Sequence, residues 1–94
     1  MANSVRTAFY ELKGEVADPS NGPTRVHCVI ELKYRHAVDA GQCWLRAMIT
    51  ARELLKRMPT DTELRPISWP IAKALKKAGR LTAFPHGDVI MLAR

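Results

Sequence analysis

Four cations lie close together between positions 73 and 80, and together they could bind an anionic surface. If residues 68–80 form a helix, a rotation of about 100° per residue gathers these cations on one side and apolar side chains on the other. The cations are Lys73, Lys76, Lys77 and Arg80, and the apolar side chains are Ile71, Ala74, Leu75 and Ala78. Lysines suit phosphates and carboxylates but carry little information about base sequence. The pattern therefore predicts electrostatic docking.

Other residue types that could carry chemistry lack the spacing that such chemistry needs. The two cysteines and three histidines show no C-x-x-C or H-x-x-x-H pattern, so no metal site is predicted. The carboxylates are scattered, and the glycines match no phosphate-binding loop. We therefore expect no catalysis and no cofactor. A small enzyme that uses His36 or Cys43 is the third and weakest hypothesis.

The two tryptophans are interpreted differently. Trp44 continues an apolar helical stripe and is predicted to lie in the core. Trp69 opens the basic helix, where it could stack on a base or anchor a protein partner. Packing of Trp69 against a long helix is the favoured interpretation, because large aromatic side chains mostly serve the core.

The 94 residues indicate one domain, 1–94, with a net charge of +6. Residues 1–45 hold five basic and five acidic groups, whereas residues 46–94 hold ten basic and four acidic groups. This localised excess favours an acidic partner, and plain solubility is the alternative explanation. No apolar run approaches the roughly 20 residues of a membrane span, and no signal peptide is evident. We therefore expect a cytoplasmic protein with reduced cysteines and no membrane partner.

Apolar and polar residues alternate over 8–16 and 25–35, which predicts two strands of an antiparallel hairpin joined by a loop at 17–23. The expected register places Lys13 opposite Glu31 and Glu11 opposite Lys33. The apolar run 89–93 predicts a strand buried on both faces, and residues 81–84 can pair with it.

A long helix is predicted to begin at Asp39, with Gln42 completing a capping box, and to end at Pro59. Its expected core stripe is Trp44, Met48, Ala51, Leu55 and Met58, widened by Leu45 and Ile49. Its expected solvent side is Arg46, Thr50, Glu53 and Arg57. After a linker at 59–67, Ser68 caps the short basic helix, Pro70 lies in its first turn, and Gly79 ends it in the left-handed conformation.

These elements predict an α+β domain in the order β-β-α-α-β, with the last strand open to division into a hairpin. The mainly antiparallel sheet would be covered by the long helix. The expected function is non-enzymatic binding of an acidic protein or nucleoprotein. The predicted contact residues are Lys73, Lys76, Lys77, Arg80 and Trp69, helped by Arg46, Arg52, Lys56 and Arg57.

In size and in its hairpin–helix–strand build, the chain is similar to the small inhibitors of phages and mobile elements, such as anti-CRISPR proteins. That resemblance implies an inhibitor that binds a host protein or nucleoprotein. The alternative is a nucleic-acid-binding domain, because a basic helix followed by a hairpin resembles the end of a winged-helix domain. That resemblance implies largely non-specific phosphate contacts. The sequence leaves open whether the chain is a monomer or a dimer.

Overall fold

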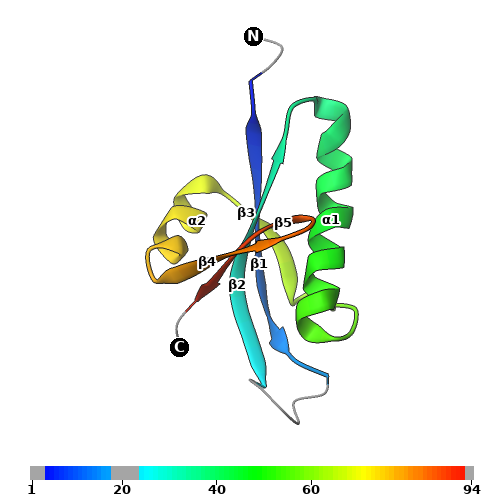
Figure 1. Cartoon of the computed structure of the whole chain (residues 1–94), viewed down its shortest axis with the longest axis vertical. Coiled ribbons are helices and arrows are strands. Elements are labelled where there is room, and N and C mark those ends of the chain that lie inside the picture. The colour runs from blue at the N-terminus through cyan, green and yellow to red at the C-terminus, as the bar shows by residue number, and fades with distance from the viewer. Residues whose placement is uncertain (1–3, 18–23, 93–94) are drawn as a thin grey trace.

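Seven elements follow one another in the computed structural model, which describes residues 4–17 and 24–92 (Figure 1). In chain order they are β1 (Arg6–Glu15), β2 (Arg25–Tyr34), α1 (Ala37–Leu55), β3 (Leu64–Ile67), α2 (Trp69–Lys76), β4 (Gly79–Phe84) and β5 (Gly87–Leu92). The strands form one sheet in the order β3-β1-β2-β5-β4, and every neighbouring pair is antiparallel. Most of the predicted loop at 17–23, and Ala93 of the predicted last strand, lie outside the described residues.

The predicted α+β class and antiparallel sheet are confirmed, but the predicted order was incomplete. The structure adds β3 between the helices and divides the C-terminal part into the hairpin β4–β5, so the sheet has five strands. The strand β3 gave no alternating signal, since it contains Pro66 and buries only Leu64 fully. It lies at the sheet edge beside β1, where a residue without an N–H group is tolerated.

The hairpin β1–β2 forms with a different register from the predicted one. Lys13 lies opposite His27 and Glu11 opposite Val29, so the predicted pairing of each with an opposite charge is wrong. The observed register pairs all ten residues of β1 with all ten residues of β2. The predicted register would have left the first residues of β2 without backbone partners, which costs more than the weak surface pairs contribute.

The side of α1 that packs on β1 and β2 consists mostly of small residues. Among the described side chains of α1, the fully buried ones are Cys43, Ala47, Thr50, Ala51 and Leu55. The predicted core stripe was therefore wrong at Trp44, Leu45 and Met58, which are 39%, 58% and 50% exposed. Thr50, predicted on the solvent side, is buried and donates its hydroxyl hydrogen to the Arg46 carbonyl oxygen at 3.0 Å. Small side chains let the helix lie close to the sheet. The close packing that results matters more for which side faces the sheet than the size of each side chain does.

The helix ends also differ from the predicted ones. The helix α1 begins after His36 rather than at Asp39, without a side-chain capping bond. It ends because Lys56 adopts the left-handed conformation, with φ of 62°, and its N–H donates to the Arg52 carbonyl. Ser68 is the N-cap of α2 as predicted, but its side chain makes no capping bond. Gly79 has no positive φ and begins β4, where a Cβ atom would overlap the Ile90 side chain.

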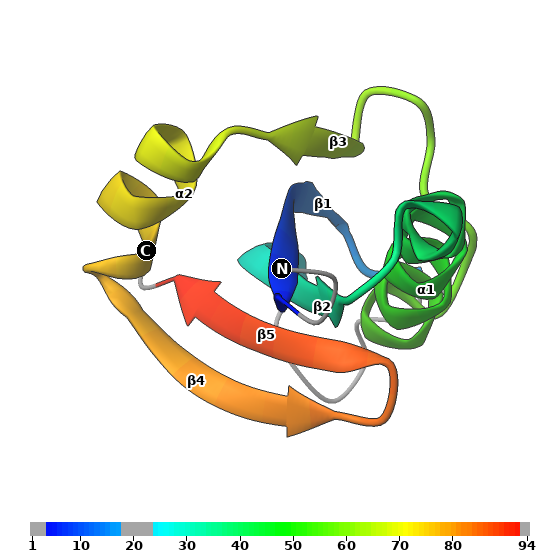
Figure 2. The same cartoon turned by 90° about the horizontal axis from the view of Figure 1, so that it is seen from above.

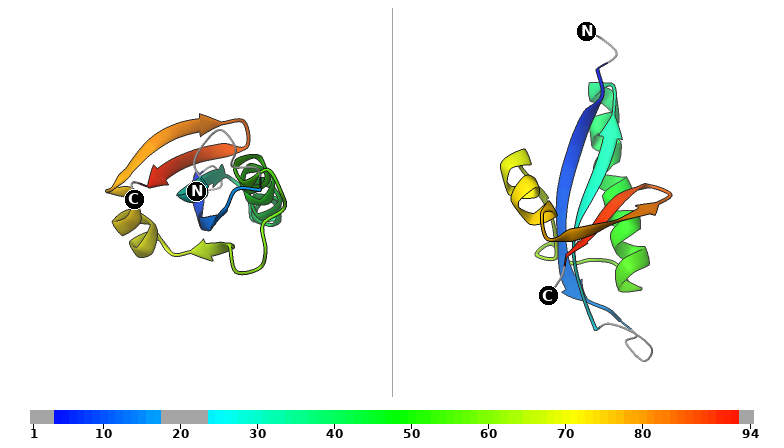
Figure 3. Two further views of the ribbon diagram at one scale, coloured as in Figure 1. Left: turned by 90° about the horizontal axis from the view of Figure 1, so that it is seen from below. Right: turned by 60° about the vertical axis from the view of Figure 1, so that its left-hand side comes forward.

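The two helices lie on opposite faces of the sheet (Figures 1 and 2). The helix α1 packs mainly on β1 and β2, not across all five strands. The helix α2 packs through Ala72 and Leu75 on a smaller cluster around Val29 and Ile90. Figure 3 shows β4 and β5 crossing β1 and β2 obliquely, so the sheet curls between the helices. Val89 and Ile90 are both buried, which confirms the prediction that this strand is covered on both faces. Neither described helix combines the length and apolar character needed to cross a membrane.

Candidate docking surface

The helix α2 is held against the sheet by few contacts, and these contacts fix which of its side chains face outward. Its only fully buried residue is Ala72, which packs with Val29 and Ile90, while Phe9 and Leu75 border the same cluster. The predicted buried side is wrong in part: Leu75 borders this cluster, but Ile71, at 43%, and Ala74 and Ala78 are exposed. A helix of eight residues depends on such docking for its stability.

Lys76 points toward the sheet and not into solvent. Its Nζ atom lies 2.6 Å from Oε1 of Glu31 on β2, and the two side chains are 28% and 18% exposed. The same ammonium group lies 5.8 Å from the ring centroid of Phe9 and 5.6 Å from that of Trp69. Lys76 therefore joins α2 to the sheet through a half-buried ion pair and two cation–π contacts. Its charge is neutralised within the fold.

The exposed part of α2 carries one aromatic residue and two cations in a row. Trp69, Lys73 and Lys77 follow at intervals of four, which places them along one side of the helix; we call them the Trp–Lys row. Trp69 is 51% exposed, and both lysines are exposed and make no ion pair among the described residues. The Trp69 ring lies 5.3 Å from the ring of Phe9 at an angle of 35°, so one part of the indole is anchored while the rest meets solvent. The prediction that Trp69 packs on the long helix is wrong, because Phe9 lies on the other sheet face.

Arg80, the last cation of the predicted helix, belongs to β4 instead. It is exposed and lies opposite Met91 of β5 in the antiparallel ladder. The hairpin β4–β5 pairs with β2 inside the sheet and does not project beside α2 as a wing would. This arrangement argues against the winged-helix resemblance.

The four remaining predicted contact residues lie on or next to α1, on the far side of the sheet from α2 (Figure 1). Arg46 donates hydrogen bonds to the carbonyl oxygens of His86 and Lys33, at 3.1 and 3.2 Å. Arg52 and Lys56 are exposed. The nine predicted contact residues therefore do not form one continuous surface.

Arg57 is tied into the fold by a network that the sequence did not indicate. Its two terminal nitrogens donate to the two carboxylate oxygens of Glu63, at 2.8 and 2.7 Å. It also donates to the carbonyl oxygens of Glu15 and Met58. The two hydrogen bonds from Arg57 to Glu63, together with one from the Thr60 N–H, lower the pKa of Glu63 to about 2. Arg57 thus fastens the end of α1 to β1 and is not available to a partner.

A second polar cluster lies on the same sheet face as α2, on the part that this helix does not cover. Glu11 accepts a hydrogen bond from Nε2 of His27 at 2.7 Å and two from Arg65 at 3.0 and 2.6 Å. Burial would raise the pKa of Glu11, but the hydrogen bonds from His27 and Arg65 outweigh it and lower the pKa. The predicted register paired Glu11 with Lys33 and missed these partners, since Arg65 comes from the unpredicted strand β3.

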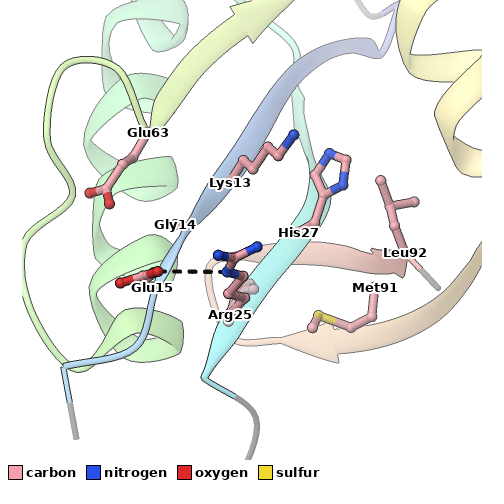
Figure 4. Close-up of a pocket in the computed structure, with 9 residues that line it drawn as sticks. Lys13, Gly14, Glu15, Arg25, His27, Glu63, Met91 and Leu92 are labelled. Atoms are coloured by element: carbon pink, nitrogen blue, oxygen red, sulfur yellow. Dashed lines mark ion pairs between the residues drawn. The ribbon is translucent and has the colours of Figure 1, made fainter. Parts of the chain in front are cut away.

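Beside this cluster, the end of the β1–β2 hairpin and β5 enclose a cleft of about 510 Å³ (Figure 4). Its wall combines charged side chains with apolar ones. It is lined by Lys13, Gly14, Glu15, Arg25, Val26, His27, Glu63, Met91 and Leu92. The charges largely compensate one another, because Glu15 lies 3.6 Å from Arg25 and Glu63 is held by Arg57.

Neither of the two thiols is activated by its surroundings. Burial raises the pKa of the Cys28 thiol to about 12 and also raises the pKa of the fully buried Cys43, so both thiols are protonated at neutral pH. Among residues 4–17 and 24–92, no group of three or more His, Cys, Asp or Glu residues could hold a metal ion.

Comparisons with known proteins give no family assignment for this chain. No protein-family profile matches the sequence. No curated protein and no solved structure shows a significant match either.

Proposed function

We propose that the chain is a non-enzymatic binding module that docks on an acidic protein or nucleoprotein through the Trp–Lys row. The observation that carries this proposal is the exposure of Trp69 beside two cations without ion-pair partners among the described residues. A half-exposed tryptophan that is already ordered by Phe9 loses little side-chain entropy on binding. Tryptophan is among the residues that most often dominate binding energy.

The charge distribution supports an acidic partner. The second half of the chain carries the whole net charge of +6, and Lys73 and Lys77 lie in that half. Exposed cations mainly raise the rate of association and select against basic partners, while the aromatic side chain supplies contact area. Arg80 lies near the end of α2 and can extend the basic field, whereas Lys76 is a structural residue in this proposal.

The test compares baits in a pull-down from a cell lysate, with bound proteins and nucleic acid both identified. The first variant reverses the charge of the row, Lys73→Glu with Lys77→Glu, and the second is Trp69→Ala. The matched control reverses the same charge elsewhere, Lys13→Glu with Lys33→Glu, at two exposed lysines of the hairpin. We expect the row variants to lose the partner and the control to keep it. Loss of the partner with the control alone would place the contact on the hairpin instead.

Nucleic-acid binding is the alternative, and one observation favours it: a half-exposed tryptophan beside lysines is able to stack on an unpaired base. A gel-shift titration with single-stranded and duplex oligonucleotides at increasing salt tests it directly. Binding that falls steeply with salt and is lost in the row variants would support this alternative. Binding that is weak and independent of salt would exclude it.

The similarity in size and build to phage-encoded inhibitors such as anti-CRISPR proteins suggests a nucleoprotein as the target. A DNA-cleavage assay with purified CRISPR effector complexes tests this hypothesis. Inhibition that disappears in the row variants would support it. If cleavage continues with the wild-type chain in excess, the inhibitor hypothesis is wrong for the effectors assayed.

A further inference from the structure

The outer side of α1 carries a second candidate contact surface, on the sheet face opposite α2. A shallow groove of about 230 Å³ runs along the helix and past its C-terminal end. We call it the α1 groove; its lining residues are Leu45, Met48, Ile49, Arg52 and Met58. Four of these five side chains are apolar, and Leu45 and Met58 are 58% and 50% exposed.

The fold buries these large side chains only in part: Met48 packs against the edge of the core, whereas Leu45 and Met58 are largely exposed. The core side of α1 consists mostly of small residues, such as Ala47 and Ala51, with Leu55 at its end, whereas leucine, isoleucine and methionine line the groove. Single apolar side chains are common on protein surfaces, but a contiguous apolar strip is typical of a contact site. Because the strip lies on one regular helix, it is ordered before any partner arrives.

The spacing of the lining residues fits a helical partner. Leu45, Ile49 and Arg52 follow at intervals of four and three, which is the spacing by which one helix packs along another. An amphipathic helix buries its apolar side in such a groove. Such a partner helix would contact the apolar strip over two turns of α1, and the flank of the partner helix would reach Arg52.

The positive charge of Arg52 favours a partner that carries a negative charge. It is the only charged residue that lines the groove, and it makes no ion pair among the described residues. Lys56, one turn further along, is exposed and also cationic. We propose that the α1 groove binds an acidic amphipathic helix of another protein, with apolar side chains on the strip and a carboxylate facing Arg52.

A second copy of this chain fits the groove less well. It would bring the same cation to the contact, and no carboxylate lines the groove to pair with it. Each copy also carries a net charge of +6, so long-range repulsion opposes self-association. An acidic helix meets neither obstacle.

The test is a display library of helical peptides with one randomised face, selected on the immobilised chain. We expect enriched peptides to carry apolar residues at helical spacing with Asp or Glu on the flank. Leu45→Asp should weaken their binding by about tenfold or more, which corresponds to about 1.4 kcal/mol. Leu45 is largely exposed, so this change leaves the fold intact. Arg52→Glu should shift the selection toward peptides with Lys or Arg.

The proposal goes beyond the Trp–Lys row, and the two can fail separately. Lys73→Glu with Lys77→Glu should leave peptide binding to the groove unchanged. The inference is wrong if no helical peptide is enriched, if the enriched peptides show no acidic preference, or if Arg52→Glu leaves that preference unchanged. Sedimentation equilibrium provides a second check. A dimer that Leu45→Asp dissociates would show that a second copy occupies the groove, and would overturn the proposal.

Discussion

Replacing Lys76 with methionine should destabilise the fold, because this ammonium group is the only partner of the Glu31 carboxylate among the described residues. Methionine keeps most of the apolar stem but removes the charge. A hydrogen bond to a charged group contributes about 1.5–3 kcal/mol. A cation–π contact at an exposed site contributes about 0.5–1 kcal/mol. Because the side chains of Lys76 and Glu31 are 28% and 18% exposed, solvent screening brings the sum toward its lower end, about 2 kcal/mol.

For a domain of this size each 1 kcal/mol shifts the midpoint of thermal unfolding by about 4–8 °C, so the expected loss is about 8–16 °C. Circular dichroism during heating and in urea measures it. Lys77→Met is the matched control, since Lys77 also lies at the C-terminal end of α2 and its loss affects the helix dipole equally. The control should change the midpoint by less than about 2 °C, as expected for an exposed site.

A double-mutant cycle with Glu31→Gln separates the ion pair from other effects of the substitution. The two changes should be non-additive by about 1 kcal/mol, because each removes the same 2.6 Å contact. Equal midpoints for Lys76→Met and Lys77→Met, with no coupling to Glu31, would refute the structural role of Lys76. Lys76 would then belong with the outward-facing lysines.

Four further predictions concern individual residues. The pKa of Glu63 is about 2 in the folded chain and 4.5 in the unfolded chain. The contribution of the Glu63 carboxylate to stability is therefore complete above pH 4.5 and is lost as the pH falls toward 2. Glu63→Gln should remove this part of the acid dependence in urea titrations across that pH range. Because burial keeps Cys28 and Cys43 protonated, neither should react with a thiol reagent before unfolding, and rapid labelling of the native chain would contradict this account. Gly87→Ala should lower the free energy of unfolding by about 1–3 kcal/mol, since its Cβ would overlap a buried leucine of β2. Gly41→Ala meets no atom within 4 Å and should instead stabilise α1 by about 0.5–1 kcal/mol.

The strands could be predicted because alternation is a local signal. In β1 and β2 every second residue is apolar, and the corresponding side chains, such as Leu12 and Ile30, are buried. The apolar run at Val89 and Ile90 likewise indicated burial on both faces. The strand β3 could not be recognised, since its only strong apolar anchor is Leu64 and its place is set by pairing with β1. That pairing is a long-range property.

The position of Lys76 could not be predicted for a related reason. Helical periodicity groups Lys76 with Lys73 and Lys77, and nothing near it in the sequence marks it as different. Its partner Glu31 lies 45 residues earlier in the chain. Arg80 was assigned to the same helix because Gly79 resembles a helix-ending glycine, whereas Gly79 is needed for the close approach of β4 to β5. The sequence thus grouped four cations on one helix face, whereas the fold leaves only Lys73 and Lys77 in that row.

Both helices depart from prediction in the same way, because each exposes large residues that were predicted to be buried. This shared departure supports both proposed contact surfaces. In α1 the sheet accepts Ala47 and leaves Leu45 outside, and in α2 it accepts Ala72 and leaves Ile71 and Trp69 outside. Burying a large apolar side chain contributes about 1.5–3 kcal/mol, so a helix whose only role was stability would turn its large residues inward. Here small side chains bring both helices close to the sheet, and although Leu55 is buried, several large side chains remain exposed, among them Leu45, Ile71 and Trp69. The proposed contact with an acidic partner would bury these exposed side chains and so account for the arrangement.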